Sequence, residues 1–189
     1  GLVGLIFAQK AVQEIPVGIE YLVDNADGRG GSLRDLAKMA VREIHISPRS
    51  GILVARPTTG KGASKLDVQN ENLRPKLLHY KFEDIINWDY QVINNVEKLS
   101  LVILREITTV RNQYKVESEY QYRVLELIDN VYHQSLFSDT GSVVNETLPV
   151  TVNGTTVDVI PFFIDDKGPE GKASITDLVD MNFHHYQVS

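Results

Sequence analysis

The stretch from Asn25 to Ser32 combines glycines, an aspartate and an amide side chain in a pattern that can serve a phosphate or a metal ion. A helix that begins behind such a loop directs free amides and its dipole at a phosphate. The known motifs do not fit, because no Gly-Lys-Ser/Thr follows and because Gly28, Gly30 and Gly31 lack dinucleotide-binding spacing. An EF-hand register with Gly28 sixth places Val23 and Arg34 where carboxylates are required. The stretch therefore predicts a structural turn and no cofactor.

The five histidines are the other candidates for metal binding. His184 and His185 are adjacent, so on a helix they point about 100° apart and cannot easily share one ion. The remaining three, His45, His79 and His133, lie in separate predicted elements, and no HExxH spacing occurs. A metal site needs several converging ligands, so none is predicted.

Catalytic side chains are equally hard to assemble from the sequence. The acidic pairs Glu83-Asp84 and Asp165-Asp166 are adjacent residues that diverge on a helix or strand, so an acid/base pair would need a partner from elsewhere. No serine has a GxSxG setting, and the chain has no cysteine, which removes thiolate catalysis, thiolate metal sites and disulfides. We expect no catalytic residues and no enzymatic activity.

The strongest predicted element is an amphipathic helix from Leu33 to Ile44. Ser32 stands at the N-cap position and Asp35 adds negative charge to the first turn. Apolar side chains recur at helical spacing and predict one buried face, with charged residues such as Glu43 on the other side. The apolar positions are Leu33, Leu36, Ala37, Ala40, Val41 and Ile44. A second helix is predicted from Ile175, with Ser174 as its N-cap.

Between these helices the pattern is strand-like. Apolar runs predict strands at Gly51–Ala55 and Lys76–Tyr80, while Thr58–Asn70 is polar and predicts a loop. Alternation from Tyr114 to Val124 predicts a half-buried strand with a bulge near Val124-Leu125. Asn94-Asn95, Asp129-Asn130 and Asn153-Gly154 predict three hairpin turns, the third between Leu148–Val152 and Thr155–Ile164. We predict that Phe82–Trp88 forms a helical turn whose Ile85, Ile86 and Trp88 enter the core.

Length and composition agree with a globular protein. The 189 residues suit one domain with an appended element, and 42% apolar with 23% charged residues is an ordinary balance. The net charge of −6 argues against a general nucleic-acid-binding surface. We predict an α+β fold in which N-terminal helices pack on an antiparallel β meander and a C-terminal helix follows. The expected divisions are an α+β domain over 1–174 and a helix beginning over 175–189, in a piece of a longer protein.

Several segments in this order resemble a tailed-bacteriophage family of portal and portal-like proteins. The resemblance covers nearly the whole chain from about Val17, and the Asn-Ala-Asp-Gly-Arg-Gly stretch and the Ile-Asn-Trp segment are its more specific parts. Ala55 departs from the family, where an acidic residue before Arg-Pro is expected. The matching segments are Asn25–Ala37, Gly51–Pro57, Phe82–Trp88, Tyr122–Leu127, Ile160–Phe162 and Asp177–Gln187.

The resemblance implies a ring protein, usually of twelve subunits, at one vertex of the phage head, assembled in the host cytoplasm. Genomic DNA would pass through the central channel without sequence-specific binding, and the major capsid protein, terminase and neck or adaptor proteins would be partners. In that scheme the domain over 1–174 is the wing and the helix from Ile175 begins the stem. An acidic wall suits this role, because a polyanion slides along it without sticking.

Aromatic residues on the predicted strands are the candidates for subunit contacts, because such residues are enriched at interfaces. Two alternatives remain: a minor head or adaptor protein that binds capsid protein without forming a ring, and a metal-dependent phage enzyme that uses Asp27 or Glu83-Asp84. The interface candidates are Tyr114, Tyr120, Tyr122, Tyr132 and Phe137.

Overall fold

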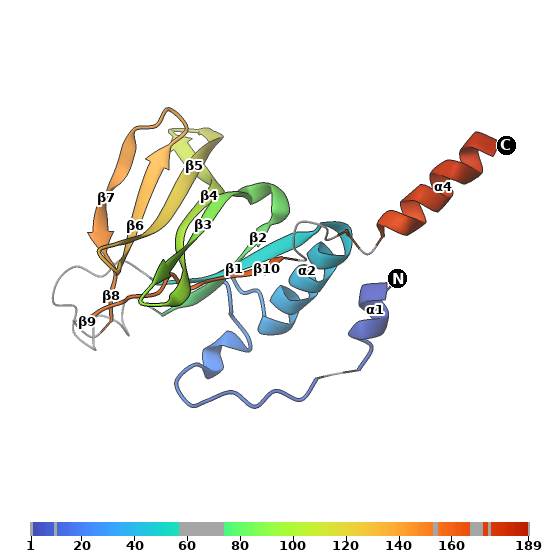
Figure 1. Cartoon of the computed structure of the whole chain (residues 1–189), viewed down its shortest axis with the longest axis horizontal. Helices are drawn as coiled ribbons and strands as arrows, with labels where there is room; N and C mark the ends of the chain where they lie inside the picture. Colours follow the sequence, from blue (N-terminus) through green and yellow to red (C-terminus); the bar gives the residue numbers. More distant parts are fainter. Residues whose placement is uncertain are drawn as a thin grey trace. The chain divides into compact units, whose positions relative to one another are not determined.

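The computed structural model describes residues 2–9, 11–56, 74–152, 155–166, 172–173 and 175–188, and Figure 1 traces its helices and strands. The helical elements are α1 (Leu2–Ile6), η1 (Glu20–Leu22), α2 (Leu33–Ile46), η2 (Phe82–Asp84) and α4 (Thr176–Val188). The strands are β1 (Arg49–Ala55), β2 (Lys76–Lys81), β3 (Ile85–Ile93), β4 (Val96–Asn112), β5 (Lys115–Ile128), β6 (Val131–Ser138), β7 (Val143–Pro149), β8 (Thr151–Val152), β9 (Thr155–Thr156) and β10 (Phe162–Asp166). The predicted α+β class, with a β meander and a C-terminal helix, is confirmed.

The chain forms two compact units. The first joins Gly1–Phe82 with Phe162–Ser189, and the second is the intervening Glu83–Pro161. The three-stranded sheet lies in the first unit and the five-stranded sheet in the second, whereas the sequence pattern predicted a single domain over 1–174. Helix α4 belongs to the first unit.

In the first unit, α2 packs against a three-stranded antiparallel sheet of order β10-β1-β2. The predicted cap is present, since the Ser32 hydroxyl oxygen accepts a hydrogen bond from the Asp35 amide at 3.1 Å. Leu36 is buried as expected, but Glu43 is buried too, at 9% exposure, although the pattern placed it on the polar face. The helix therefore turns one carboxylate toward its sheet, a feature that its apolar periodicity does not encode.

The core of the first unit is centred on the contact between the Phe162 ring and the backbone of Gly51. Phe162 of β10 packs over Gly51 of β1, and a Cβ built at Gly51 would overlap the Phe162 ring. Tyr80 of β2 meets Phe162 edge to face, with ring centroids 5.9 Å apart. Leu53, Tyr80 and Phe162 are at most 6% exposed, so this cluster is the centre of the unit.

The second unit contains the predicted meander, a five-stranded antiparallel sheet in which β3 to β7 lie side by side in sequence order (Figure 1). Two of the predicted hairpin turns are confirmed. Asn94 and Asn95 have φ of 53° and 62°, and Asp129 and Asn130 have φ of 51° and 61°. Positive φ at both central positions is the condition for a tight two-residue hairpin, and short polar side chains tolerate it.

An ion pair joins the two longest strands of this sheet. Arg123 of β5 donates from Nε and Nη2 to the two carboxylate oxygens of Glu106 on β4, at 2.6 and 3.0 Å. Gln121 Nε2 donates to the same carboxylate at 2.8 Å. The Arg123 and Glu106 side chains are each 15% exposed, so the ion pair is largely shielded from solvent. Its two parallel hydrogen bonds give it the bidentate geometry of a strong arginine–carboxylate pair. Beside it, Val102, Leu104 and Leu125 are fully buried.

Three local predictions are wrong. Only Phe82–Asp84 is helical, because Ile85 already begins β3, and while Ile85 is buried, Ile86 is 47% exposed. The β4–β5 register runs unbroken through Val124 and Leu125, so no bulge lies there. The third predicted hairpin is present only as the short antiparallel pair β8–β9, in which Thr151 and Val152 lie opposite Thr156 and Thr155. Its predicted extension to Ile164 is wrong, since Phe162–Asp166 pairs with β1 instead. In each case cross-strand pairing overrides a local pattern.

The predicted loop at Thr58–Asn70, the Asn153-Gly154 turn and the Ser174 cap lie outside the described residues. Within the part of the chain that is described, no helix combines the length and apolar character needed to cross a bilayer.

We expect Gly51→Ala to destabilise the first unit, because its new Cβ would overlap the ring of the buried Phe162, which would have to shift. Overpacking of this kind costs about 1–3 kcal/mol. Urea unfolding followed by circular dichroism measures the change. Gly4→Ala is the control, since a Cβ there meets nothing within 4 Å and unfolding should be unchanged or slightly harder. Equal midpoints for Gly51→Ala and the parent chain would contradict the packing described above.

Candidate functional site

In the glycine-rich loop, side-chain oxygens accept hydrogen bonds from backbone amides of the same loop. Asp27 Oδ1 accepts from the amides of Arg29 at 2.7 Å and Gly31 at 2.9 Å, and Asn25 Oδ1 accepts from the Gly30 amide at 2.9 Å. The amide hydrogen bond from Arg29 is the largest cause that lowers the pKa of Asp27. Because these amides already have acceptors, they do not form a phosphate cradle. The geometry agrees with the predicted structural turn.

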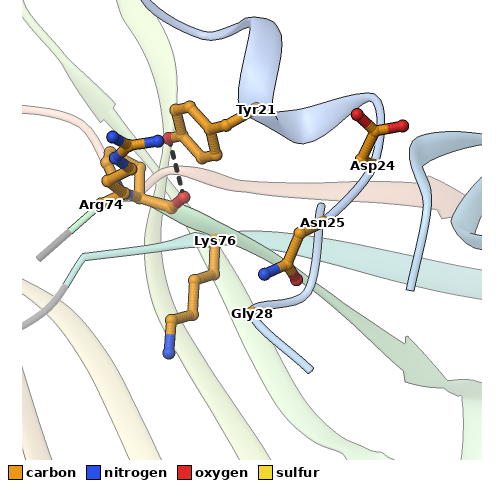
Figure 2. Close-up of a pocket in the computed structure, with 7 residues that line it drawn as sticks. Tyr21, Asp24, Asn25, Gly28, Arg74 and Lys76 are labelled. Carbon is orange, nitrogen blue, oxygen red and sulfur yellow. Dashed lines mark hydrogen bonds between the residues drawn. The ribbon is translucent and has the colours of Figure 1, made fainter. Parts of the chain in front are cut away.

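A cavity of about 300 Å³ lies between this loop, η1 and the start of β2. Figure 2 draws its lining, in which Tyr21 of η1 faces Arg74 and Lys76 extends along the glycine loop. The Tyr21 hydroxyl donates to the carbonyl of Pro75 at 2.9 Å and thereby ties η1 to the segment that leads into β2. Sequence reasoning missed this cavity, because its walls come from residues about 50 positions apart.

The structure also brings together a serine and a histidine. Ser50 Oγ of β1 lies 2.8 Å from His79 Nε2 of the neighbouring strand β2. Such a contact can activate a serine nucleophile, but Ser50 is 2% exposed, so a substrate has no access to its hydroxyl. We interpret the contact as a structural hydrogen bond in the core.

The environment of His79 favours its neutral form. Burial lowers the pKa of His79, the nearby Glu43 carboxylate opposes this change, and the Lys81 charge adds to it. Glu43 comes from α2, so the helix that covers the sheet contributes to the electrostatic environment of His79.

The predicted acidic and imidazole candidates do not converge. Asp84 Oδ1 forms an ion pair with Arg105 Nη2 at 3.1 Å, and Asp165 lies on β10 opposite Ser50. Among the described residues, no group of three or more His, Asp or Glu side chains is arranged to hold a metal ion. The five histidines lie on α2, β2, β6 and α4.

The predicted interface residues divide between surface and core. Tyr114 is 97% exposed at the β4–β5 turn, and Tyr120 is 46% exposed with the Arg105 guanidinium 5.2 Å from its ring centroid. Tyr122 and Phe137 are cross-strand neighbours on one face of the sheet and are half-buried. Tyr132 is 3% exposed and belongs to the core of the second unit, so its ring is not available to a partner.

Comparisons with protein-family models and with curated proteins found no match to this chain.

The stability of the first unit should fall as the pH drops below about 6.5, the ordinary pKa of histidine. In that range the unfolded chain takes up a proton at His79 while the folded chain, whose His79 pKa is lowered, resists it, so acid favours unfolding. Urea midpoints measured by circular dichroism between about pH 7.5 and 5.5 test this. His79→Gln should flatten the pH dependence, and His184→Gln, on the exposed face of α4, should leave it unchanged. If the urea midpoint of His79→Gln changed with pH as steeply as that of the parent chain, His79 would be excluded as the origin of the pH dependence.

Proposed function

We propose that this chain is a structural subunit of a bacteriophage portal ring at the head vertex of the virion, without catalytic activity of its own. The single observation that carries the proposal is the extent of apolar surface on elements that have no cover within the described chain. The resemblance of the sequence to portal and portal-like proteins supplies the specific assignment.

Helix α4 is the clearest case of such a surface. Leu178, Met181, Phe183 and Tyr186 are between 64% and 79% exposed. At 100° per residue these positions fall within an arc of about 200°, and the opposite side carries Asp177, Asp180, His184 and Gln187. A wide apolar face of this kind is normally packed against other elements, so α4 needs neighbours along that face. Packing against equivalent helices around an axis provides them.

The β4–β5 hairpin carries a second apolar surface. Ile107 and Tyr120 are cross-strand partners and are 66% and 46% exposed, and Val116 lies on the same face at 63% exposure. With Tyr114 at the turn, they form a strip along one face of the hairpin, in which Thr109 and Ser118 lie between Val116 and the Ile107–Tyr120 pair. Exposed apolar side chains gathered on one face favour a protein contact surface. The strip includes two of the predicted interface tyrosines.

The net charge of −6 suits a channel component. A negatively charged wall repels the phosphate backbone and lets DNA pass, whereas a basic wall would retain it. We therefore propose that DNA passes the ring without sequence-specific binding, and that capsid protein, terminase and neck or adaptor proteins bind to the ring's outer surfaces.

The alternative of a metal-dependent phage enzyme finds less support. Its candidate carboxylates are already engaged, Asp27 with backbone amides and Asp84 with Arg105. Magnesium-dependent DNA cleavage that disappears in Asp84→Asn would favour the enzyme. A minor head or adaptor protein would instead bind capsid protein while remaining unable to form rings by itself.

Native mass spectrometry and negative-stain electron microscopy test the proposal directly. We expect closed rings whose mass is a multiple, usually twelvefold, of the 21.2 kDa chain. Phe183→Glu places a charge in the proposed contact and should weaken association by at least about tenfold. Gln91→Glu adds the same charge at an exposed polar position on β3 and should leave the rings intact. A chain that stays monomeric at every concentration tested would contradict the ring.

A further inference from the structure

The β4–β5 hairpin extends beyond the strands on either side of it. β3 pairs with β4 only as far as Leu104, and β6 pairs with β5 only from Gln121 onward. The rest of the hairpin, which we call the ribbon, consists of residues 107–112 of β4 and 115–120 of β5 with the turn between them. Within the described chain these two stretches pair only with each other, so each has one edge with no strand beside it.

The ribbon also has little cover on its faces. All side chains of residues 115–120 are exposed, and in the β4 half Ile107 and Val110 are 66% and 43% exposed. A two-stranded hairpin that packs against nothing is at best marginally stable in water. The ribbon is therefore an element that gains stability from a neighbour outside the described chain.

The outer strands of the five-stranded sheet are less regular than the ribbon. β3 shifts its register against β4 at two places, and β7 pairs irregularly with β6 and ends at Pro149. Bulges and proline on an outer strand hinder pairing with a further strand. The β4–β5 register is unbroken through the ribbon, and residues 107–112, Ile-Thr-Thr-Val-Arg-Asn, contain neither proline nor lysine. This edge of β4 is thus regular, rich in β-branched residues and suited to the addition of a strand.

The two halves of the ribbon differ in charge. Residues 107–112 contain a single charged side chain, the cation Arg111. Residues 115–120 contain Lys115, Glu117 and Glu119, and the first two form an ion pair within the strand, so the net charge is negative. Opposite charges favour contact between two surfaces, and like charges oppose it. The β4 half of one copy is therefore complementary to the β5 half of another copy, and two β4 halves are not complementary to each other.

Head-to-tail contact pairs both edges of the ribbon in every copy. Ribbons that point the same way and lie side by side bring β5 of one copy next to β4 of the following copy. The new strand pair is antiparallel, because β4 and β5 are themselves antiparallel. Pairing of β4 with β4 would join only two copies and would leave both β5 edges unpaired. A head-to-tail contact that repeats around an axis closes a ring.

We propose that neighbouring copies of this chain are joined by a continuous antiparallel β-sheet, in which residues 107–112 of one copy pair with residues 115–120 of the next. The inference rests on the proposed ring and specifies one of its contacts. Main-chain hydrogen bonds join the ribbon edges, and the exposed strip that contains Ile107 and Tyr120 lies beside the same strip of the next copy.

Hydrogen exchange read by mass spectrometry tests this pairing on the full chain. The exchange of assembled protein is compared with that of protein diluted to the monomer, and native mass spectrometry at the same concentrations reports the assembly. We expect amides of both ribbon stretches, 107–112 and 115–120, to exchange at least about tenfold more slowly in the assembly. Amides of residues 89–93 on β3 serve as the internal reference and should exchange at the same rate in both states.

A pair of lysine variants tests the same contact by mutation. Thr109→Lys places a charge at an exposed position of the β4 half and should weaken association by at least about tenfold, because an edge lysine opposes strand addition. Gln91→Lys adds the same charge at an exposed position of β3 and should leave association unchanged. Circular dichroism verifies that both variants fold, and the exchange measurement on the parent chain does not depend on either.

Each outcome supports or overturns the pairing. Slower exchange in both stretches of the ribbon supports it. Slower exchange in residues 107–112 alone, in an assembly with the mass of a dimer, indicates symmetric β4–β4 pairing and overturns it. Rings in which both stretches exchange as fast as in the monomer also overturn it and leave the proposed ring intact. A chain that is monomeric at every concentration contradicts the ring itself, and this contact with it.

Discussion

The pairing of β10 with β1 is the constraint on which the first unit depends. The two strands are separated in sequence by the whole second unit, so the chain must close a long loop before their contacts form. The contact that repays this cost is the Phe162 ring over Gly51, with Tyr80 against its edge and Leu53 beside it. A glycine at position 51 is what allows the ring to lie on the sheet, and α2 packs against β1 and β2 of the same sheet.

The glycine-rich loop is joined to this framework by its backbone. The Leu77 amide of β2 donates to the Ala26 carbonyl at 2.8 Å, and Ala26 is fully buried. Within the loop, the amides of Arg29, Gly30 and Gly31 donate to the side chains of Asp27 and Asn25. Lys76 runs against the loop at Gly28 and lines the same cavity as Tyr21 and Arg74.

The surfaces of the two units share one property. Large apolar side chains are exposed on α4 of the first unit and on the β4–β5 hairpin of the second. The residue pairs considered for catalysis are instead engaged with partners in the chain. Ser50 and His79 bond to each other inside the core, and Asp84 pairs with Arg105. This distribution agrees with the proposal that the protein acts through contact with other chains.

Local patterns in the sequence were sufficient for the elements whose causes are local. Ser32 and the apolar periodicity behind it determined α2, and the Asn-Asn and Asp-Asn pairs determined two hairpin turns, because a cap and a positive φ are properties of a few neighbouring residues. Tertiary structure alone decided which strand Phe162 joins, why Glu43 is buried, and why Tyr132 lies in a core while Tyr120 lies on a surface. These outcomes depend on pairing between distant segments, and alternation along one strand specifies two faces without specifying what will cover either of them.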